Sequence, residues 1–273
     1  MNKLKGKLFF KKFHGKKTPL NFFTGINIIY GESGVGKSLI LDSIQKNKTL
    51  KSSNFEVEYD SNEFKSYTVY QNPDNQLLAT TVSSELTFSG ECAQKGPEEL
   101  KNILDNGLKY LPDYIDPKMN PGHLSGGEKE QLNLIAALEF NPDILLIDDS
   151  LSFLSHKNKI KYVKILNEWI KKSSGIIIWV TSEYSDIQFG DYSWILSLSK
   201  IISCNSYLPK QYEMVDIHPG QLNCDINELG FNYQNSRSIF SKITIKIENV
   251  RSLGLYGENG SGKTTFAGLC FGD

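Results

Sequence analysis

The stretch INIIYGESGVGKS, residues 26–38, decides the fold of this chain. Its first five residues form an apolar, β-prone run, and residues 31–38 fit the pattern GxxxxGK[ST]. The glycines of that pattern let consecutive backbone N–H groups turn toward one point, where they and the next helix N-terminus bind phosphate. Because residues 39–44 are compatible with a helix, the stretch predicts a phosphate-binding loop (P-loop) between a strand and a helix.

A bound nucleotide would use this loop together with a carboxylate. Lys37 is expected to reach the β- and γ-phosphates of ATP, and Ser38 Oγ is expected to ligate Mg²⁺. Asp148 ends the apolar run 144–147, which is typical of a buried central strand, and is the expected partner of the metal. An aspartate that only caps a helix or lies in a loop is the alternative. The predicted nucleotide contacts are Gly31, Ser33, Gly34, Gly36, Lys37 and Ser38.

Residues 120–128, NPGHLSGGE, discriminate among nucleotide-binding folds. Ser125 is a good N-cap for the helix predicted over residues 127–140, so a capped helix after a glycine turn is one interpretation. Between the P-loop and the strand that ends in Asp148, however, the segment resembles the signature sequence of ABC ATPases. In that family the signature of one domain binds the γ-phosphate held by the other domain of a dimer. The signature residues are Leu124, Ser125, Gly126, Gly127 and Glu128.

Residues 70–76, YQNPDNQ, lie where ABC ATPases have their Q-loop. The resemblance implies that Gln71 touches Mg²⁺ and the attacking water. The sequence QNPDNQ and residues 81–88, TVSSELTF, resemble the corresponding segments of energy-coupling-factor (ECF) importers, which take up vitamins and transition-metal ions. In those importers this region faces the transmembrane partner, although the bare segment equally allows a polar, proline-containing loop.

Strand candidates, among them residues 66–70, alternate with helix candidates along the chain, which predicts an α/β fold with a parallel sheet. The resemblance specifies a P-loop NTPase with an ABC-type helical subdomain as a nucleotide-binding domain over residues 1–206. Residues 207–224 indicate a linker, and residues 225–273 the start of a second ABC domain, which we expect to be incomplete.

A second P-loop, GENGSGKT at residues 257–264, defines that second copy, and the apolar, β-prone run at residues 252–256 before it indicates a strand. The resemblance places an adenine-stacking aromatic at Tyr233 there, and at Phe13 or His14 in the first copy. Thr264 is also a predicted Mg²⁺ ligand. The other predicted nucleotide contacts of the second copy are Gly257, Gly260, Gly262, Lys263 and Thr265.

Four positions depart from the family pattern. Asp149 stands where ABC ATPases usually have the glutamate that polarises water, and it is one methylene shorter. Ser155 replaces a loop aspartate, Ser182 replaces the switch histidine, and Gln131 replaces a basic residue after the signature. Since a misplacement of about 1 Å can cost on the order of a hundredfold in rate, the first site is expected to bind ATP and hydrolyse it slowly. The predicted catalytic residues are Asp149, Gln71 and Ser182, and the predicted metal ligands are Ser38, Gln71, Asp148 and Thr264.

Composition narrows the class of function further. The chain has 30 Lys plus Arg against 31 Asp plus Glu, a net charge of -1, so we expect no nucleic acid partner. Its four cysteines are not at metal-ligand spacing. The sequence shows neither a signal-peptide core nor a run approaching the ~20 apolar residues of a membrane span. We therefore expect a soluble chain that meets a membrane only through a partner.

The resemblance implies an ATPase, converting ATP and water to ADP and phosphate, that drives a membrane importer. It would be cytoplasmic and peripheral on the inner face of the cell membrane. The implied partners are a transmembrane coupling subunit, a substrate-binding membrane subunit and a second nucleotide-binding domain. Two alternatives stay open. One is a nucleotide-gated, hydrolysis-poor structural subunit or truncated fragment, and the other is a non-transport ABC ATPase.

Overall fold

The computed structural model describes residues 3–13, 17–59, 64–152, 154–204, 222–232, 238–257 and 261–271. The chain divides into two compact units, Met1–Pro209 and Lys210–Asp273, and each is described by itself. Three of the predicted contacts cannot be placed. Tyr233, Gly260 and the side chain of Phe13 lie outside the described residues, as does His14.

A six-stranded sheet forms the centre of the first unit, in the order β10-β9-β3-β8-β7-β6. Every neighbouring pair is parallel except β10 with β9. The P-loop strand β3 and the strand β7 that ends in Asp148 are therefore separated by β8 alone, and their carboxyl ends meet at one edge. The strands are β3 (Gly25–Tyr30), β6 (Ser66–Val69), β7 (Ile144–Asp148), β8 (Ile176–Thr181), β9 (Tyr192–Leu196) and β10 (Ile201–Ser203).

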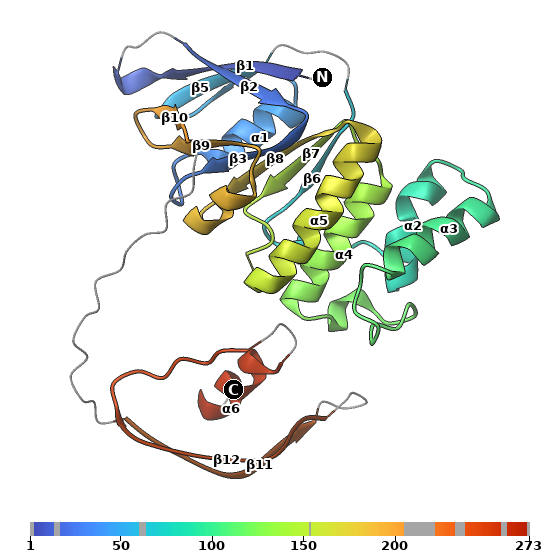
Figure 1. The fold of residues 1–273 in the computed structure, drawn as a ribbon, viewed down its shortest axis with the longest axis vertical. Helices are drawn as coiled ribbons and strands as arrows, with labels where there is room; N and C mark the ends of the chain where they lie inside the picture. Colours follow the sequence, from blue (N-terminus) through green and yellow to red (C-terminus); the bar gives the residue numbers. More distant parts are fainter. Residues whose placement is uncertain are drawn as a thin grey trace. The chain divides into compact units, whose positions relative to one another are not determined.

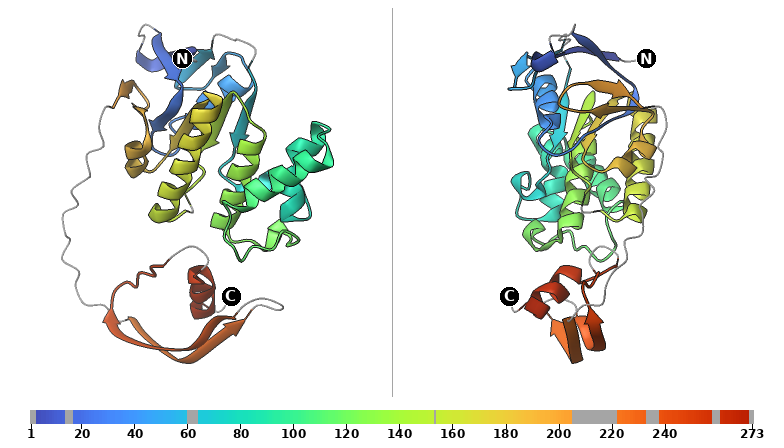
Figure 2. Two further views of the ribbon diagram at one scale, coloured as in Figure 1. Left: turned by 45° about the vertical axis from the view of Figure 1, so that its right-hand side comes forward. Right: turned by 90° about the vertical axis from the view of Figure 1, so that its left-hand side faces the viewer.

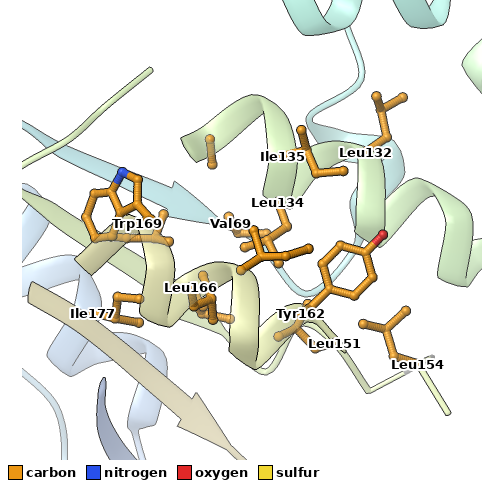
Figure 3. Close-up of a cluster of buried hydrophobic side chains, with 14 of the residues drawn as sticks. Val69, Leu132, Leu134, Ile135, Leu151, Leu154, Tyr162, Leu166, Trp169 and Ile177 are labelled. Carbon is orange, nitrogen blue, oxygen red and sulfur yellow. The ribbon is translucent and has the colours of Figure 1, made fainter. Parts of the chain in front are cut away.

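Both faces of this sheet are covered at its centre, which explains why β7 and β8 are nearly continuous apolar runs rather than alternating ones. On one face, Ile177 of β8 lies in the same cluster as α4 (Gly126–Glu139) and α5 (His156–Ser173), as Figure 3 shows. On the other face, Ile178 packs with α1 (Lys37–Gln45) and with the second sheet. The P-loop and β7 are thus fixed from both sides.

The second sheet is four-stranded and antiparallel, in the order β2-β1-β5-β4, and α1 lies between it and the central sheet (Figure 1). In β1 buried positions alternate with exposed or half-buried ones, so a single face meets the core. The strands are β1 (Lys3–Phe10), β2 (Thr18–Phe23), β4 (Leu50–Lys51) and β5 (Phe55–Tyr59).

A helical part lies beside the sheet. Helices α2 (Val82–Cys92) and α3 (Pro97–Leu108) pack on each other and on α4, on the side of α4 away from α5 (Figures 1 and 2). Thr81 caps α2 by accepting a hydrogen bond from the Ser84 N–H. None of the helices that the structure describes combines the length and the apolar character needed to span a bilayer.

The described part of the second unit comprises β11 (Leu222–Asn232), β12 (Ser238–Val250) and α6 (Lys263–Phe271). The two strands form an antiparallel pair. The β-prone run at residues 252–256 forms no strand, contrary to its sequence pattern. A strand needs a neighbour to satisfy its backbone, and no described strand pairs with this run. Leu253, Leu255 and Tyr256 are accordingly exposed.

Candidate nucleotide-binding site

The P-loop of the first unit takes a backbone path that requires glycine. Gly34 and Gly36 have φ values of 82° and 101°, in the left-handed region that side chains rarely adopt. Gly36 is also the N-cap of α1, and a Cβ there would lie 2.6 Å from Cζ of Phe55. The loop is therefore built tightly against β5, with the first N–H groups of α1 directed toward the loop.

Lys37 lies at the centre of the candidate site and is only 7% exposed. Its Nζ donates hydrogen bonds to Gly31 O at 2.9 Å, Glu32 O at 3.1 Å and Ser182 Oγ at 2.9 Å. Burial lowers the pKa of the Lys37 ammonium, and the nearby carboxylates of Asp149 and Asp148 oppose that shift. The Lys37 side chain folds back over the loop. Its ammonium can therefore bind a triphosphate only by exchanging these protein oxygens for phosphate oxygens.

The predicted metal ligands Ser38 and Asp148 are in direct contact. Ser38 Oγ donates a hydrogen bond to Asp148 Oδ1 at 2.9 Å. Burial raises the pKa of Asp148, the bond from Ser38 lowers it, and the neighbouring Asp149 raises it further. A hydroxyl and a carboxylate oxygen side by side fit Mg²⁺, which prefers hard oxygen ligands and takes few of them from protein.

Asp149 and Ser182 form a second contact pair. The Ser182 N–H donates to Asp149 Oδ1 at 2.9 Å, and Ser182 Oγ donates to Oδ2 at 2.5 Å. Asp149 Oδ2 also lies 3.9 Å from the Lys37 ammonium. The backbone of Asp149 is left-handed, with a φ of 46°, and its N–H is held by Val180 O at 2.9 Å. Ser182 therefore binds both oxygens of this carboxylate and fixes its direction.

Gln71 is not brought into contact with this group. It is exposed and lies two residues beyond β6, whose end at Val69 pairs with Ile147 of β7, so it belongs to the same edge of the sheet. Within the described residues, no hydrogen bond joins Gln71 to Ser38 or Asp148. The loop is held instead by Gln76, which accepts from the Tyr70 N–H at 2.8 Å.

The signature segment forms the capped start of α4. Glu128 Oε2 accepts a hydrogen bond from the Ser125 N–H at 2.7 Å, and Glu128 Oε1 accepts from Tyr114 Oη at 2.5 Å. Leu124 is buried, whereas Gly126 is exposed. Ser125 Oγ has no hydrogen-bond partner within the described part of the chain. Leu124 and Glu128 thus anchor the turn. Gly126 is its exposed residue, and the Ser125 hydroxyl beside it is buried.

Sequence reasoning missed a buried ionic group beside Ser182. Lys159 of α5 is 3% exposed and contacts Glu183 and Asp186. The helical spacing of Lys159, Tyr162 and Leu166 was a signal in the sequence. It places the lysine on the apolar side of α5, where all three residues are buried. A lysine at a helical core position needs a buried partner.

Gln131, predicted as a departure with a functional cost, has a structural role. It is 3% exposed and its Oε1 accepts a hydrogen bond from Tyr162 Oη at 2.8 Å, which joins α4 to α5. Ser155 similarly caps α5 by accepting a hydrogen bond from the Asn158 N–H at 3.3 Å. Both residues contribute to the scaffold around the site.

The second P-loop repeats the local geometry of the first. Lys263 Nζ donates to Gly257 O at 2.9 Å, as Lys37 does to Gly31, and Gly262 has a φ of 88°. Thr264 is exposed and Thr265 half-buried at the start of α6. The roles of these residues in nucleotide binding stay predictions.

Residues 24–152 match the family model described as ABC transporter. The chain contains an ABC transporter domain. The matched residues hold the P-loop, the signature and the strand that ends in Asp148. This agrees with the family resemblance deduced from those motifs.

Curated relatives of the ABC domain are named energy-coupling factor transporter ATP-binding protein EcfA1. The protein of Mesomycoplasma hyopneumoniae strain 7448 is 29% identical over 137 residues, which is 50% of this chain and 50% of that protein. The protein of Clostridium perfringens strain ATCC 13124 is 32% identical over 118 residues, 43% of this chain and 42% of that protein. The chain spans about half the length of the curated relatives it matches.

Solved structures share the fold. CbiO1 from Clostridium perfringens, described as part of the ABC transporter complex CbiONQ, has a TM-score of 0.58 at 23% identity, covering 73% of this chain and 86% of that chain. A dimeric ATP-binding cassette with bound ADP and phosphate has a TM-score of 0.58 at 22% identity, covering 76% of this chain and 100% of that chain. The fold is thus a P-loop NTPase fold of ABC type.

Proposed function

We propose that the chain is an ATP-binding and ATP-hydrolysing subunit of an ECF-type membrane importer. The observation that carries the proposal is the contact of Ser38 with Asp148 at 2.9 Å, directly beside the buried ammonium of Lys37. A phosphate cradle, a cation and an oxygen pair suited to Mg²⁺ are the parts that phosphoryl transfer needs. The names of the curated relatives support the ECF class.

In this proposal each group of residues at the site has its own role in binding or hydrolysing ATP. Backbone N–H groups of the P-loop bind the phosphates of ATP, and Lys37 moves from Gly31 O and Glu32 O to phosphate oxygens. Ser38 and Asp148 would hold Mg²⁺, which would neutralise negative charge on the phosphates. Asp149, held by Ser182, accepts a proton from the attacking water. Gln71 joins this group only after the exposed loop that carries it has moved.

The proposed partners follow from the signature segment at the start of α4. Ser125 and Gly126 form the N-terminus of α4, and Gly126 is exposed there. Because a helix N-terminus binds anions, we propose that these residues bind the nucleotide of a second nucleotide-binding domain. The transmembrane coupling subunit and the substrate-binding membrane subunit belong to the same proposal. The chain would act peripherally, on the cytoplasmic face of the membrane.

A second candidate function is nucleotide binding with little hydrolysis. It is favoured by the two hydrogen bonds from Ser182 to Asp149, because a carboxylate with both oxygens occupied is a poorer base for water. The short side chain of Asp149 also favours slow hydrolysis. Slow turnover at the first site belongs to this proposal.

Turnover assays on Lys37→Ala and Lys263→Ala in the full chain test these proposals. Loss of ATP hydrolysis in Lys37→Ala would assign turnover to the first site. Loss only in Lys263→Ala would assign turnover to the second site and support the second candidate. Lys164→Ala, an exposed lysine on α5, serves as the control. Wild-type turnover in both P-loop variants would refute ATP hydrolysis by this chain.

A further inference from the structure

The buried ammonium of Lys159 has no place in the mechanism above, although it lies close to the site. Lys159 Nζ is 2.7 Å from Glu183 Oε2 and 2.9 and 3.2 Å from the two oxygens of Asp186. Lys159 is 3% exposed and Asp186 2% exposed. One cation thus joins α5 to the segment that follows β8.

This cluster holds the chain on both sides of Ser182. Before it, Thr181 Oγ1 donates to Asp186 Oδ2 at 2.7 Å. After it, the Glu183 N–H donates to Thr181 Oγ1 at 3.0 Å, and the Glu183 carboxylate meets Lys159. The position of Ser182 is therefore set by contacts of its two neighbours.

The same contacts close a ring through Asp149. From Asp149 the chain runs through residues 150–155 into α5, whose first turn is capped by Ser155 and carries Lys159. From Lys159 the ring passes through Glu183 and Asp186 to Ser182. Ser182 then returns to both carboxylate oxygens of Asp149. The ring thus connects the Lys159 ammonium to the Asp149 carboxylate.

A buried ion group of this kind is weak support for stability, since its desolvation cost offsets much of its attraction. Its effect on geometry is stronger, because the carboxylates of Glu183 and Asp186 both bind the same ammonium of Lys159. We propose that Lys159 is a positioning residue that fixes Ser182 and thereby directs Asp149 at the water that attacks ATP. The hydrolytic part of this inference rests on the proposed function.

The test must separate positioning from folding. Lys159→Met alone leaves Asp186 buried without its cation and is expected to destabilise the chain. The double variant Lys159→Met with Asp186→Asn removes both charges and is expected to recover most of the melting temperature. Lys164→Met, an exposed lysine of the same helix, is the matched control.

The first readout is hydrogen exchange at the Ser182 amide, which donates directly to Asp149. It needs no nucleotide. The double variant should exchange at this amide about tenfold faster than the wild type, as for the loss of one hydrogen bond, while the control keeps the wild-type rate. A wild-type exchange rate in a stable double variant would overturn the inference.

The second readout is single-turnover hydrolysis of ATP by the full chain. The double variant should lose about tenfold to a hundredfold in rate with less than a twofold change in ATP affinity. A wild-type rate in the double variant would also overturn the inference. If the wild-type chain neither binds nor hydrolyses ATP, the proposed function fails, whereas the amide exchange still decides whether Lys159 positions Ser182.

Discussion

At the scale of single residues, the short side chains of Asp149 and Ser182 fit each other. Ser182 reaches both oxygens of Asp149 with its N–H and its hydroxyl, at 2.9 and 2.5 Å. The left-handed backbone of Asp149 directs its carboxylate toward that position. Asp149 and Ser182, which both depart from the family pattern, therefore form one hydrogen-bonded pair. The effect of either residue on hydrolysis depends on the other.

The ionisation of Asp148 should link stability to pH. Because burial raises the pKa of Asp148, the folded chain holds that proton more tightly than the unfolded chain. The ionised carboxylate therefore costs stability above the shifted pKa, and this cost disappears as pH falls below the ordinary value. Asp148→Asn should raise the melting temperature by about 2 °C at pH 7, with the gain shrinking toward about pH 4.

Thermal melts across pH check this expectation. Asp113→Asn, an exposed aspartate, is the control and should shift the melting temperature little at any pH. An Asp148→Asn chain that is less stable than the wild type at pH 7 would contradict the assigned direction of the pKa shift.

The backbone of the P-loop gives another residue-scale prediction. Gly36→Ala places a Cβ 2.6 Å from Phe55 at a φ of 101°. The variant should lose about 1–3 kcal/mol of unfolding free energy and most of its ATP affinity. Gly96→Ala is the matched control, because its φ is -70° and nothing lies within 4 Å of the added Cβ. Urea denaturation of both variants measures the difference, and equal losses would refute the strain.

At the scale of elements, α4 and α5 are joined by a buried polar contact within an apolar layer. Tyr162 Oη donates to Gln131 Oε1 at 2.8 Å, and it also lies 3.0 Å from Tyr110 O. Burial raises the pKa of Tyr162 well above its ordinary value, so the hydroxyl stays a donor. Figure 3 shows the ring of Tyr162 between α4 and the loop that carries Leu151 and Leu154.

Tyr162→Phe tests this contact. It leaves the buried amide oxygen of Gln131 without its donor and should cost about 1–3 kcal/mol of unfolding free energy. Tyr192→Phe in the half-buried strand β9 is the comparison and should cost less. Chemical denaturation measures both, and equal stability of Tyr162→Phe and the wild type would count against the contact.

Elements with strong local patterns were predicted closely from sequence. The helix expected over residues 127–140 is α4 at Gly126–Glu139, and the strand expected at 66–70 is β6 at Ser66–Val69. Residues 252–256 were misjudged, because apolar alternation reports β-propensity but not the neighbouring strand that a sheet requires.

For the candidate site, too, local sequence patterns predicted only part of the arrangement. Local motifs predicted that Ser38 and Asp148 bind one metal ion, since each lies at the end of a recognisable strand or loop. The structure brings the two side chains into contact, and their metal role stays a prediction. They could not predict Lys159 with Asp186, whose contact depends on how α5 packs beside β8. Gln71 stays apart from the site in this structure, and its predicted role is untested.

At the scale of the whole molecule, the chain carries two P-loops with the same lysine-to-carbonyl contact, one in each unit. In the first unit, Ser38 at the end of the loop also contacts Asp148, the aspartate that ends β7. Tight Mg²⁺-dependent ATP binding is therefore expected at the first loop. Equilibrium dialysis should lose that tight site in Lys37→Ala and keep it in Lys263→Ala, and the reverse result would contradict this assignment.

The shared metal of Ser38 and Asp148 is the central claim, and Mn²⁺ in place of Mg²⁺ tests it most directly. Electron paramagnetic resonance titrations should show that Ser38→Ala and Asp148→Asn each weaken Mn²⁺ binding to the ATP complex by about tenfold, with metal-free ATP affinity changed less than twofold. Lys164→Ala should match the wild type. Unchanged Mn²⁺ affinity in both site variants would contradict the account.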